Sequence, residues 1–274
     1  MDAEEPWGAH APNSIIRGWI ALCRSLPPAP PFRRLGIWLR SPVKRMLRGP
    51  VDTRLWGLRL RLHPRGNLSE ARWLFLPQFA DRRERETLAR RLQPGGLFVD
   101  IGANAGLYSF WVWSRFGDRV RTEAFEPDPA LCARIRFNLA ANGAGSIRLN
   151  PVALGDTEGA ARLRVGTANR GTNRIAAETE EGVEVPLTTL AAFAAANGLQ
   201  RIDALKIDVE GHEAPILSHF FAHAPAALRP RLLICETLGP GAGAGPLHRA
   251  LREAGYAPLL RGRMNTVFEL RPGG

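Results

Sequence analysis

Short apolar runs alternate with amphipathic stretches over the last two-thirds of the chain. Residues 97–101 have the length of a strand buried on both faces, and residues 107–116 are apolar enough for a packed helix. A short strand is expected at residues 122–126, and a helix after Asp128 that ends at the Asn142-Gly143 pair. This alternation of strands and helices predicts an α/β domain.

The same pattern continues to the end of the chain and closes with two adjacent strands. Further strands are expected at residues 147–154, 162–165, 183–187, 203–207 and 232–235, with helices at residues 191–197 and 246–254. Residues 256–260 and 266–270 are typical of an antiparallel hairpin. The order of elements favours one substantial α/β domain rather than two.

The front of the chain follows a different pattern. Apolar residues recur at helical spacing in residues 13–26, a proline-rich stretch interrupts them, and the helical pattern resumes in residues 32–48. Residues 58–63 alternate like an edge strand. Residues 70–92 are helical in pattern and lead into the next strand, so they could form a lid over a pocket there.

The positive charge of the chain is concentrated in this front part. The net charge is +11, and residues 1–96 hold 18 Lys and Arg against 8 Asp and Glu, which is +10. Residues 97–274 hold 19 against 18, which is +1. We therefore divide the chain into a basic, proline-containing N-terminal extension at residues 1–62 and a catalytic domain at residues 63–274.

Two further features concern the surroundings of the protein. No apolar run approaches the ~18 residues of a membrane span, but a basic, Trp-bearing amphipathic segment such as residues 13–48 can lie on an anionic membrane surface. Packing on its own domain or on a partner subunit is an equal alternative. Cys23, Cys132 and Cys235 are far apart and odd in number, which argues against a disulfide framework and indicates a reducing cytoplasm.

A glycine-containing loop follows the first strand of the α/β domain. Gly102 and Gly106 permit backbone conformations and close approaches that a Cβ would obstruct. The dinucleotide fingerprint would need a glycine in place of Asn104, and no Gly-Lys-Ser/Thr sequence follows, so a pyrophosphate or triphosphate ligand is unlikely. Glu126 ends the second strand in the window where a carboxylate that binds ribose hydroxyls is expected. These features predict a site for a nucleoside without a phosphate cradle.

Acidic residues gather where two other strands end. Asp208, Glu210, His212 and Glu213 follow the strand at residues 203–207, and Glu236 follows the strand at residues 232–235. Ligands of open α/β sheets bind at the carboxyl ends of the strands. Because such charges are costly in a core, we expect the cluster to line a cleft.

With these segments laid out, the chain resembles the FkbM family of S-adenosylmethionine-dependent methyltransferases from about His63 to Leu270. The resemblance rests on Phe-Val-Asp-Ile-Gly-Ala-Asn-Ala-Gly at residues 98–106, Phe-Glu-Pro at 125–127, Val-Ala-Leu-Gly-Asp at 152–156 and Leu-Lys-Ile-Asp-Val-Glu-Gly-His-Glu at 205–213. The last block is the most specific. Family members often have a small or apolar residue in place of His212, so no function of this histidine is carried over.

The resemblance implies a Rossmann-like class I methyltransferase fold, with a seven-stranded, mostly parallel sheet and a C-terminal antiparallel hairpin. It also implies that S-adenosyl-L-methionine lies across the carboxyl ends of the first strands. By that analogy, Asp100, Gly102, Asn104 and Gly106 surround the methionine end, Glu126 holds the ribose, and Ala153, Leu154 and Asp156 bound the adenine.

Methyl transfer from a sulfonium depends mainly on alignment and on the exclusion of water. A hydroxyl acceptor on a sugar, a glycan or a secondary metabolite must also lose its proton, and Asp208, Glu210 and His212 are the candidate bases. The same carboxylates, with Glu236, could bind a divalent cation, but we do not expect a metal site.

Three other functions remain as alternatives. A non-catalytic adapter with a methyltransferase-like fold could bind membrane or an anionic polymer through its basic front end, although the intact glycine loop argues against it. The charge also prompts a nucleic-acid methyltransferase, but the chain lacks the Asn/Asp-Pro-Pro-Tyr/Phe block that amino-methylating enzymes of this kind often have. A nicotinamide oxidoreductase ranks lower still, because the third fingerprint glycine is missing.

Overall fold

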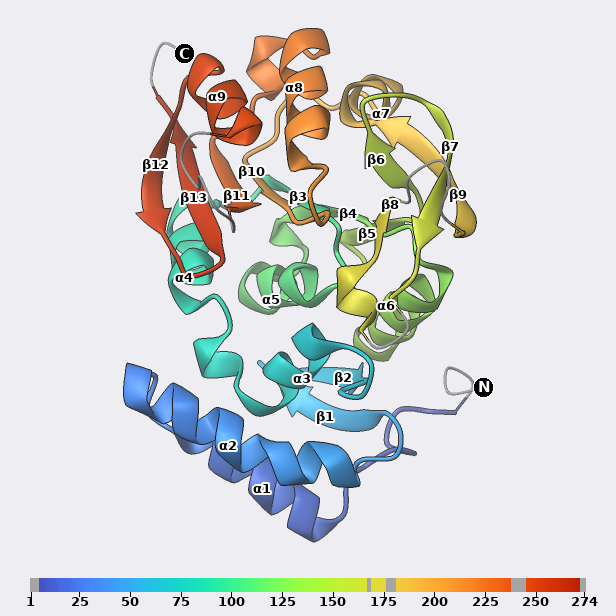
Figure 1. The fold of residues 1–274 in the computed structure, drawn as a ribbon, viewed down its shortest axis with the longest axis vertical. Helices are drawn as coiled ribbons and strands as arrows, with labels where there is room; N and C mark the ends of the chain where they lie inside the picture. The colour runs from blue at the N-terminus through green and yellow to red at the C-terminus, as the bar shows by residue number, and fades with distance from the viewer. Residues whose placement is uncertain (1–4, 167–168, 176–180, 238–244, 272–274) are drawn as a thin grey trace.

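The computed structural model describes residues 5–166, 169–175, 181–237 and 245–271. Within them, a seven-stranded sheet has the order β12-β13-β11-β10-β3-β4-β5 (Figure 1). Its parallel strands are β3 (Leu97–Ile101), β4 (Arg121–Phe125), β5 (Ile147–Asn150), β10 (Ala204–Ile207) and β11 (Leu232–Glu236). The hairpin of β12 (Tyr256–Arg261) and β13 (Asn265–Leu270) joins antiparallel to β11. This arrangement confirms the Rossmann-like class I methyltransferase fold predicted from the sequence.

Helices cover both faces of this sheet. One layer contains α4 (Arg82–Arg91), α5 (Leu107–Phe116) and α6 (Pro129–Asn142), and the other contains α7 (Leu190–Ala196), α8 (Glu213–His223) and α9 (Pro246–Glu253) (Figure 1). Alternate residues of β3 serve the two layers. Phe98 packs in the same cluster as Phe110 of α5, whereas Val99 packs with Leu217 of α8. Such two-sided burial accounts for the nearly continuous apolar run in this strand.

The N-terminal extension packs against one end of this domain (Figure 1). It contains α1 (Ser14–Ser25), α2 (Pro30–Met46) and the antiparallel ribbon of β1 (Val51–Leu55) and β2 (Leu58–Leu62). Cys23 and Val43 belong to the same apolar cluster as Phe110. The side-chain amide of Gln78 also donates to the carbonyl of Cys23 at 2.8 Å. The extension is therefore continuous with the core beneath α5.

The helix expected over residues 70–92 is two helices. Helix α3 (Leu68–Phe75) ends before Pro77, and α4 begins after Asp81, whose φ of 43° is left-handed. Proline has no N–H to continue a helix, and a left-handed residue reverses its direction. The single-helix prediction was therefore wrong at this break, which turns α3 across the end of the sheet.

The strand expected over residues 147–154 is also divided. Pro151 separates β5 from β6 (Ala153–Gly155), and β6 belongs to a second, four-stranded sheet of order β6-β9-β7-β8. The other strands of this sheet are β7 (Gly159–Arg164), β8 (Arg174–Ile175) and β9 (Val183–Thr189). The sequence placed β7 and β9 correctly as extra strands, but the proline break assigns the last part of the expected strand to this second sheet.

No helix in the described parts of the chain combines the length and the apolar character needed to cross a bilayer.

Candidate active site

A cavity of about 380 Å³ lies at the carboxyl ends of β3, β4 and β10. Its size falls within the range of about 300–1,000 Å³ that is usual for small-molecule sites. Its walls come from the loop after β3, the ends of β4 and β10, the first turns of α3, residues 169–175 and the turn between β12 and β13. Six segments that are distant in sequence therefore form the walls of one cavity.

The loop after β3 is shaped by its glycine residues. Gly102 has a φ of +69°, and a Cβ at this position would overlap the carbonyl oxygen of Asp208. This loop therefore lies directly against the segment that follows β10. Gly106 has a φ of +72° at the start of α5, and a Cβ there would come within 3.1 Å of the Phe110 ring and 3.2 Å of Ile135. Gly102 lines the cavity, whereas Gly106 lies outside the lining and serves the packing of the turn.

Glu126 follows β4, and its buried carboxylate reaches the cavity wall. Oε2 accepts the backbone N–H of Asn104 at 2.8 Å, and Oε1 accepts that of Asp128 at 2.9 Å. Burial raises the pKa of the Glu126 carboxyl to about 8. A carboxylate oxygen can accept more than one hydrogen bond, so capacity remains for hydroxyl groups of a ligand.

Asp100 does not line the cavity, in contrast to the expectation from the resemblance. Its fully buried carboxylate accepts the Ser109 hydroxyl at 2.7 Å, and Oδ1 lies 3.6 Å from Nζ of Lys206. Lys206 lines the cavity and also lies 3.5 Å from Oδ2 of Asp208. Burial lowers the pKa of Lys206, but the carboxylates of Asp208 and Asp100 outweigh that effect and raise the pKa above its ordinary value. Asp100 therefore forms an ion pair with Lys206 and does not line the cavity itself, whereas Lys206 does.

The three residues expected around the adenine lie in two different places. Ala153 and Leu154 line the cavity beside Phe125. Asp156 is exposed and lies in a separate surface hollow with Thr189, because the chain turns outward after β6. The predicted contact between Asp156 and adenine is therefore not supported by its position.

The predicted acidic cluster does assemble beside the cavity. One oxygen each of Asp208, Glu210 and Glu236 lies within 4.8 Å of the others, an arrangement that could hold a divalent cation. Burial, together with the charges of Asp208, Glu210 and Glu213 and a hydrogen bond with Asp208, raises the pKa of Glu236 to about 7. Burial and the neighbouring charge of Asp208 also raise the pKa of Glu210.

His212 and Glu213 have separate positions. His212 lines the cavity just before α8, and its Nδ1 makes no hydrogen bond within the described residues. Glu213 lies outside the lining, where its carboxylate accepts the backbone N–H groups of Val209 at 2.9 Å and Gly211 at 3.1 Å. Glu213 therefore shapes the loop on which Glu210 and His212 stand.

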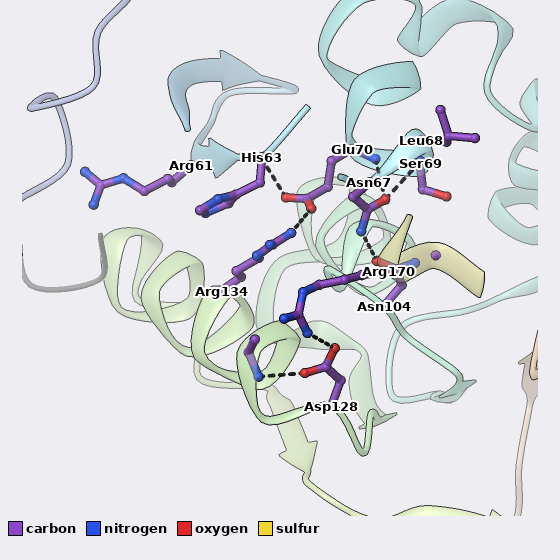
Figure 2. Close-up of polar contacts among 12 residues, drawn as sticks. Arg61, His63, Asn67, Leu68, Ser69, Glu70, Asn104, Asp128, Arg134 and Arg170 are labelled. Atoms are coloured by element: carbon purple, nitrogen blue, oxygen red, sulfur yellow. Dashed lines mark hydrogen bonds and ion pairs between the residues drawn. The ribbon is translucent and has the colours of Figure 1, made fainter. Parts of the chain in front are cut away.

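Asn67 joins the N-terminal side of the cavity to the loop after β3 (Figure 2). Its Oδ1 accepts the N–H groups of Ser69 at 3.0 Å and Glu70 at 3.2 Å, which caps α3. Its Nδ2 donates to Oδ1 of Asn104 at 2.6 Å. Glu70 in turn forms an ion pair with Arg134 of α6. The buried Asn67 is thus fixed by the first turn of α3, and its amide orients the side chain of Asn104.

Residues of the segment 169–175 line the cavity next to the start of α3. The backbone N–H of Arg170 donates to the carbonyl of Gly66 at 2.8 Å, and Oδ1 of Asn169 accepts the N–H of Leu68 at 3.0 Å. The guanidinium of Arg170 binds Asp128, the N-cap of α6, at 2.6 Å (Figure 2). These bonds connect this segment to both neighbouring helices.

Asn67, Lys206 and Arg170 are not among the site residues predicted from the sequence. Asn67 precedes Glu70 by three residues, and this spacing is typical of a helix N-terminus, so the cap was detectable. Lys206 is one of only two lysines and stands two residues before Asp208 in the most specific motif. Arg170 had no comparable signal, because its partners Gly66 and Asp128 are distant from it and from each other in the sequence.

The profile described as "Methyltransferase FkbM domain" matches residues 100–258 of the chain. The chain belongs to the FkbM methyltransferase family. Membership of this family implies S-adenosylmethionine as the methyl donor. A relative is the AMB antimetabolite synthetase AmbE of Pseudomonas aeruginosa, which is 27% identical over 239 residues. That match covers 71% of this chain but only 11% of the larger protein.

Solved methyltransferase structures also resemble this member of the FkbM family. The precorrin-6y C5,15-methyltransferase of Geobacter metallireducens is 14% identical, with a TM-score of 0.42 and coverage of 70% of this chain and 88% of that one. The ribosomal protein L11 methylase of Lactobacillus delbrueckii subsp. bulgaricus is 11% identical, with a TM-score of 0.43 and coverage of 70% and 80%. The fold is assigned from the strand order of the seven-stranded sheet.

Replacing Asn67 by Ala should weaken cofactor binding, because Asn104 loses the side chain that orients it. We expect a loss of about 1 kcal/mol in binding free energy, measured by calorimetric titration with S-adenosylmethionine. Asn13→Ala is the matched control, since Asn13 caps α1 with a 2.9 Å bond to the N–H of Ile16 far from the cavity. Equal affinities in the two folded variants would contradict the positioning function of Asn67.

Proposed function

We propose that this methyltransferase transfers the methyl group of S-adenosylmethionine to a hydroxyl group of a sugar, a glycan or a secondary metabolite. The observation that carries the proposal is the gathering of carboxylate oxygens of Asp208, Glu210 and Glu236 within 4.8 Å of one another at the cavity. Burial and the neighbouring charges raise the pKa of Glu236 to about 7. A hydroxyl acceptor must lose its proton as it attacks, and a base that titrates near neutral pH suits that step.

The residues of the cavity fit the cofactor. Glu126 offers acceptor capacity to the ribose hydroxyls, and Phe125 with Leu154 offers an apolar slot for the adenine. Lys206 is suited to the carboxylate of the methionine end, in place of the Asp100 contact expected earlier. The bound cofactor supplies a methyl group that is already activated on a sulfonium, so these residues serve to bind and align it.

We assign the proton to the Asp208–Glu236 pair, and within it to Glu236, because burial and the charges of Asp208, Glu210 and Glu213 raise the pKa of Glu236 to about 7. A carboxylate oxygen of Glu236 lies within 4.8 Å of one of Asp208. Asp208 in turn forms an ion pair with Lys206 at 3.5 Å. His212 lines the same wall and is a weaker candidate, because it stands at the start of α8.

Replacing Glu126 by Gln should weaken S-adenosylmethionine binding by about 1–3 kcal/mol, because the amide keeps one acceptor oxygen where the carboxyl group has two. Calorimetric titration measures the effect. Glu123→Gln is the matched control: Glu123 is a buried glutamate of β4 that lies outside the cavity and accepts from Asn150 at 2.9 Å. Unchanged affinity in a folded Glu126→Gln protein would remove this residue from the site, and no binding by the unaltered protein would favour the adapter alternative.

Asp208→Asn should lower turnover by about 10²-fold with cofactor affinity little changed, because proton removal is separable from cofactor binding. His212→Ala should reduce turnover less. Single-turnover kinetics on the true acceptor measure both effects. We expect a chelator to leave turnover unchanged, since the pair holds a proton rather than a cation; a chelator-induced loss that Mg²⁺ restores would instead assign Asp208, Glu210 and Glu236 to metal binding.

Turnover should rise with pH through about 7, because Glu236 can accept a proton only after losing its own. Below this pH the pair is protonated and inactive as a base, and above it turnover reaches a plateau. A pH–rate profile at saturating cofactor measures the transition. The Glu236→Gln protein should lack it, and persistence of the same transition in that variant would show that another group titrates.

A further inference from the structure

The two N-terminal helices form a surface of one charge sign. Residues 13–48 contain eight basic residues, Arg17, Arg24, Arg33, Arg34, Arg40, Lys44, Arg45 and Arg48, and no Asp or Glu. Arg24 is committed to the fold, because it donates to the carbonyl oxygens of Leu74 at 2.8 Å and Arg54 at 2.9 Å. Arg34 and Arg45, in contrast, are exposed on α2. Arg17 and Arg48 are exposed as well, so half of these eight charges are available to a partner.

A row of large apolar side chains lies beside these charges. Leu35, Trp38 and Met46 of α2 are 41%, 72% and 62% exposed. Their spacing of three and eight residues keeps them within one side of the helix, next to Arg34 and Arg45. Helix α2 thus shows an outward apolar stripe flanked by arginines.

The inner face of α2 packs against the rest of the protein. Gly36 and Val43 are buried on that side, and the indole N–H of Trp19 in α1 donates to the carbonyl of Leu39 at 2.7 Å. Helix α1 adds two outward apolar residues of its own, Ile15 and Leu22, which are 72% and 46% exposed. The two helices lie side by side at one end of the molecule (Figure 1), so the exposed stripe is not needed for the fold.

We propose that α1 and α2 form a docking surface for an anionic lipid membrane. Apolar side chains flanked by arginines suit the boundary between charged headgroups and acyl chains, where both contribute to binding. A second copy of this chain would bring two acid-free basic surfaces together, which is repulsive. A nucleic acid or another anionic polymer would satisfy the arginines but would leave Leu35 and Met46 in water. Of these three occupants, the lipid surface is the one that meets both features.

Sedimentation of the full-length protein with vesicles tests this assignment. We expect binding to vesicles of equal parts phosphatidylglycerol and phosphatidylcholine, little binding to phosphatidylcholine alone, and loss of binding at high salt. The double variant Arg34→Gln, Arg45→Gln should bind about fivefold more weakly for each charge removed. Trp38→Ala should bind about tenfold more weakly, because its apolar contact with lipid is lost.

Matched controls are available on the catalytic domain. Arg162 and Arg231 are exposed there, and Leu259 is 42% exposed on β12. The variants Arg162→Gln, Arg231→Gln and Leu259→Ala should bind vesicles like the unaltered protein. Titration with S-adenosylmethionine confirms that each variant is folded, and the readout is independent of the acceptor and of turnover.

Three results would overturn the proposal. The first is no sedimentation with the acidic vesicles, or equal weakening by the control substitutions. The second is that the protein does not bind vesicles but forms a dimer, and that Trp38→Ala abolishes this dimer. That result would assign the surface to a second copy of the chain. The third is binding to heparin that Trp38→Ala leaves unchanged, in the absence of vesicle binding, which would assign it to an anionic polymer.

Discussion

The contact between Gly102 and the carbonyl of Asp208 is the constraint on which the rest of the cavity depends. With no space for a Cβ at Gly102, the loops that follow β3 and β10 meet backbone to backbone. That approach sets Asn104 on one side of the contact and Asp208 on the other. The groups suited to the cofactor and the groups suited to the acceptor's proton are therefore fixed relative to each other by the sheet itself.

At the carboxyl edge of the sheet, the buried charge of Lys206 is stabilised by ion pairs with neighbouring carboxylates. Lys206 lies between Asp100 and Asp208, so an ammonium that would be costly alone is compensated on two sides. Glu126 has no cation in direct contact among the described residues, and burial raises its pKa accordingly. These are the settings in which ionisable groups acquire unusual affinities for protons and polar ligands.

Much of the sheet could be predicted from the sequence because its signals are local. The bounds of β3 and α5 agree with the apolar runs, and Asp128 caps α6 as its position before Pro129 indicates. The errors have equally local causes, since Pro77 and Pro151 end elements that periodicity alone would extend. The contacts of Asp100 and Asp156 with the cofactor were expected from the family resemblance, and the structure places both residues outside the cavity lining.

The first turns of α3 have a consequence for how this family's domain can be exchanged between proteins. The residues that the family profile matches begin at residue 100, yet Leu68 and Trp73 line the cavity and Asn67 holds Asn104. A segment cut at the limits of the profile would begin inside β3 and would also lack the residues of α3 that form one side of the cavity. Recombination that preserves the catalytic core must therefore also import a compatible preceding segment, so the evolutionary module is longer than the part of it that sequence similarity reveals.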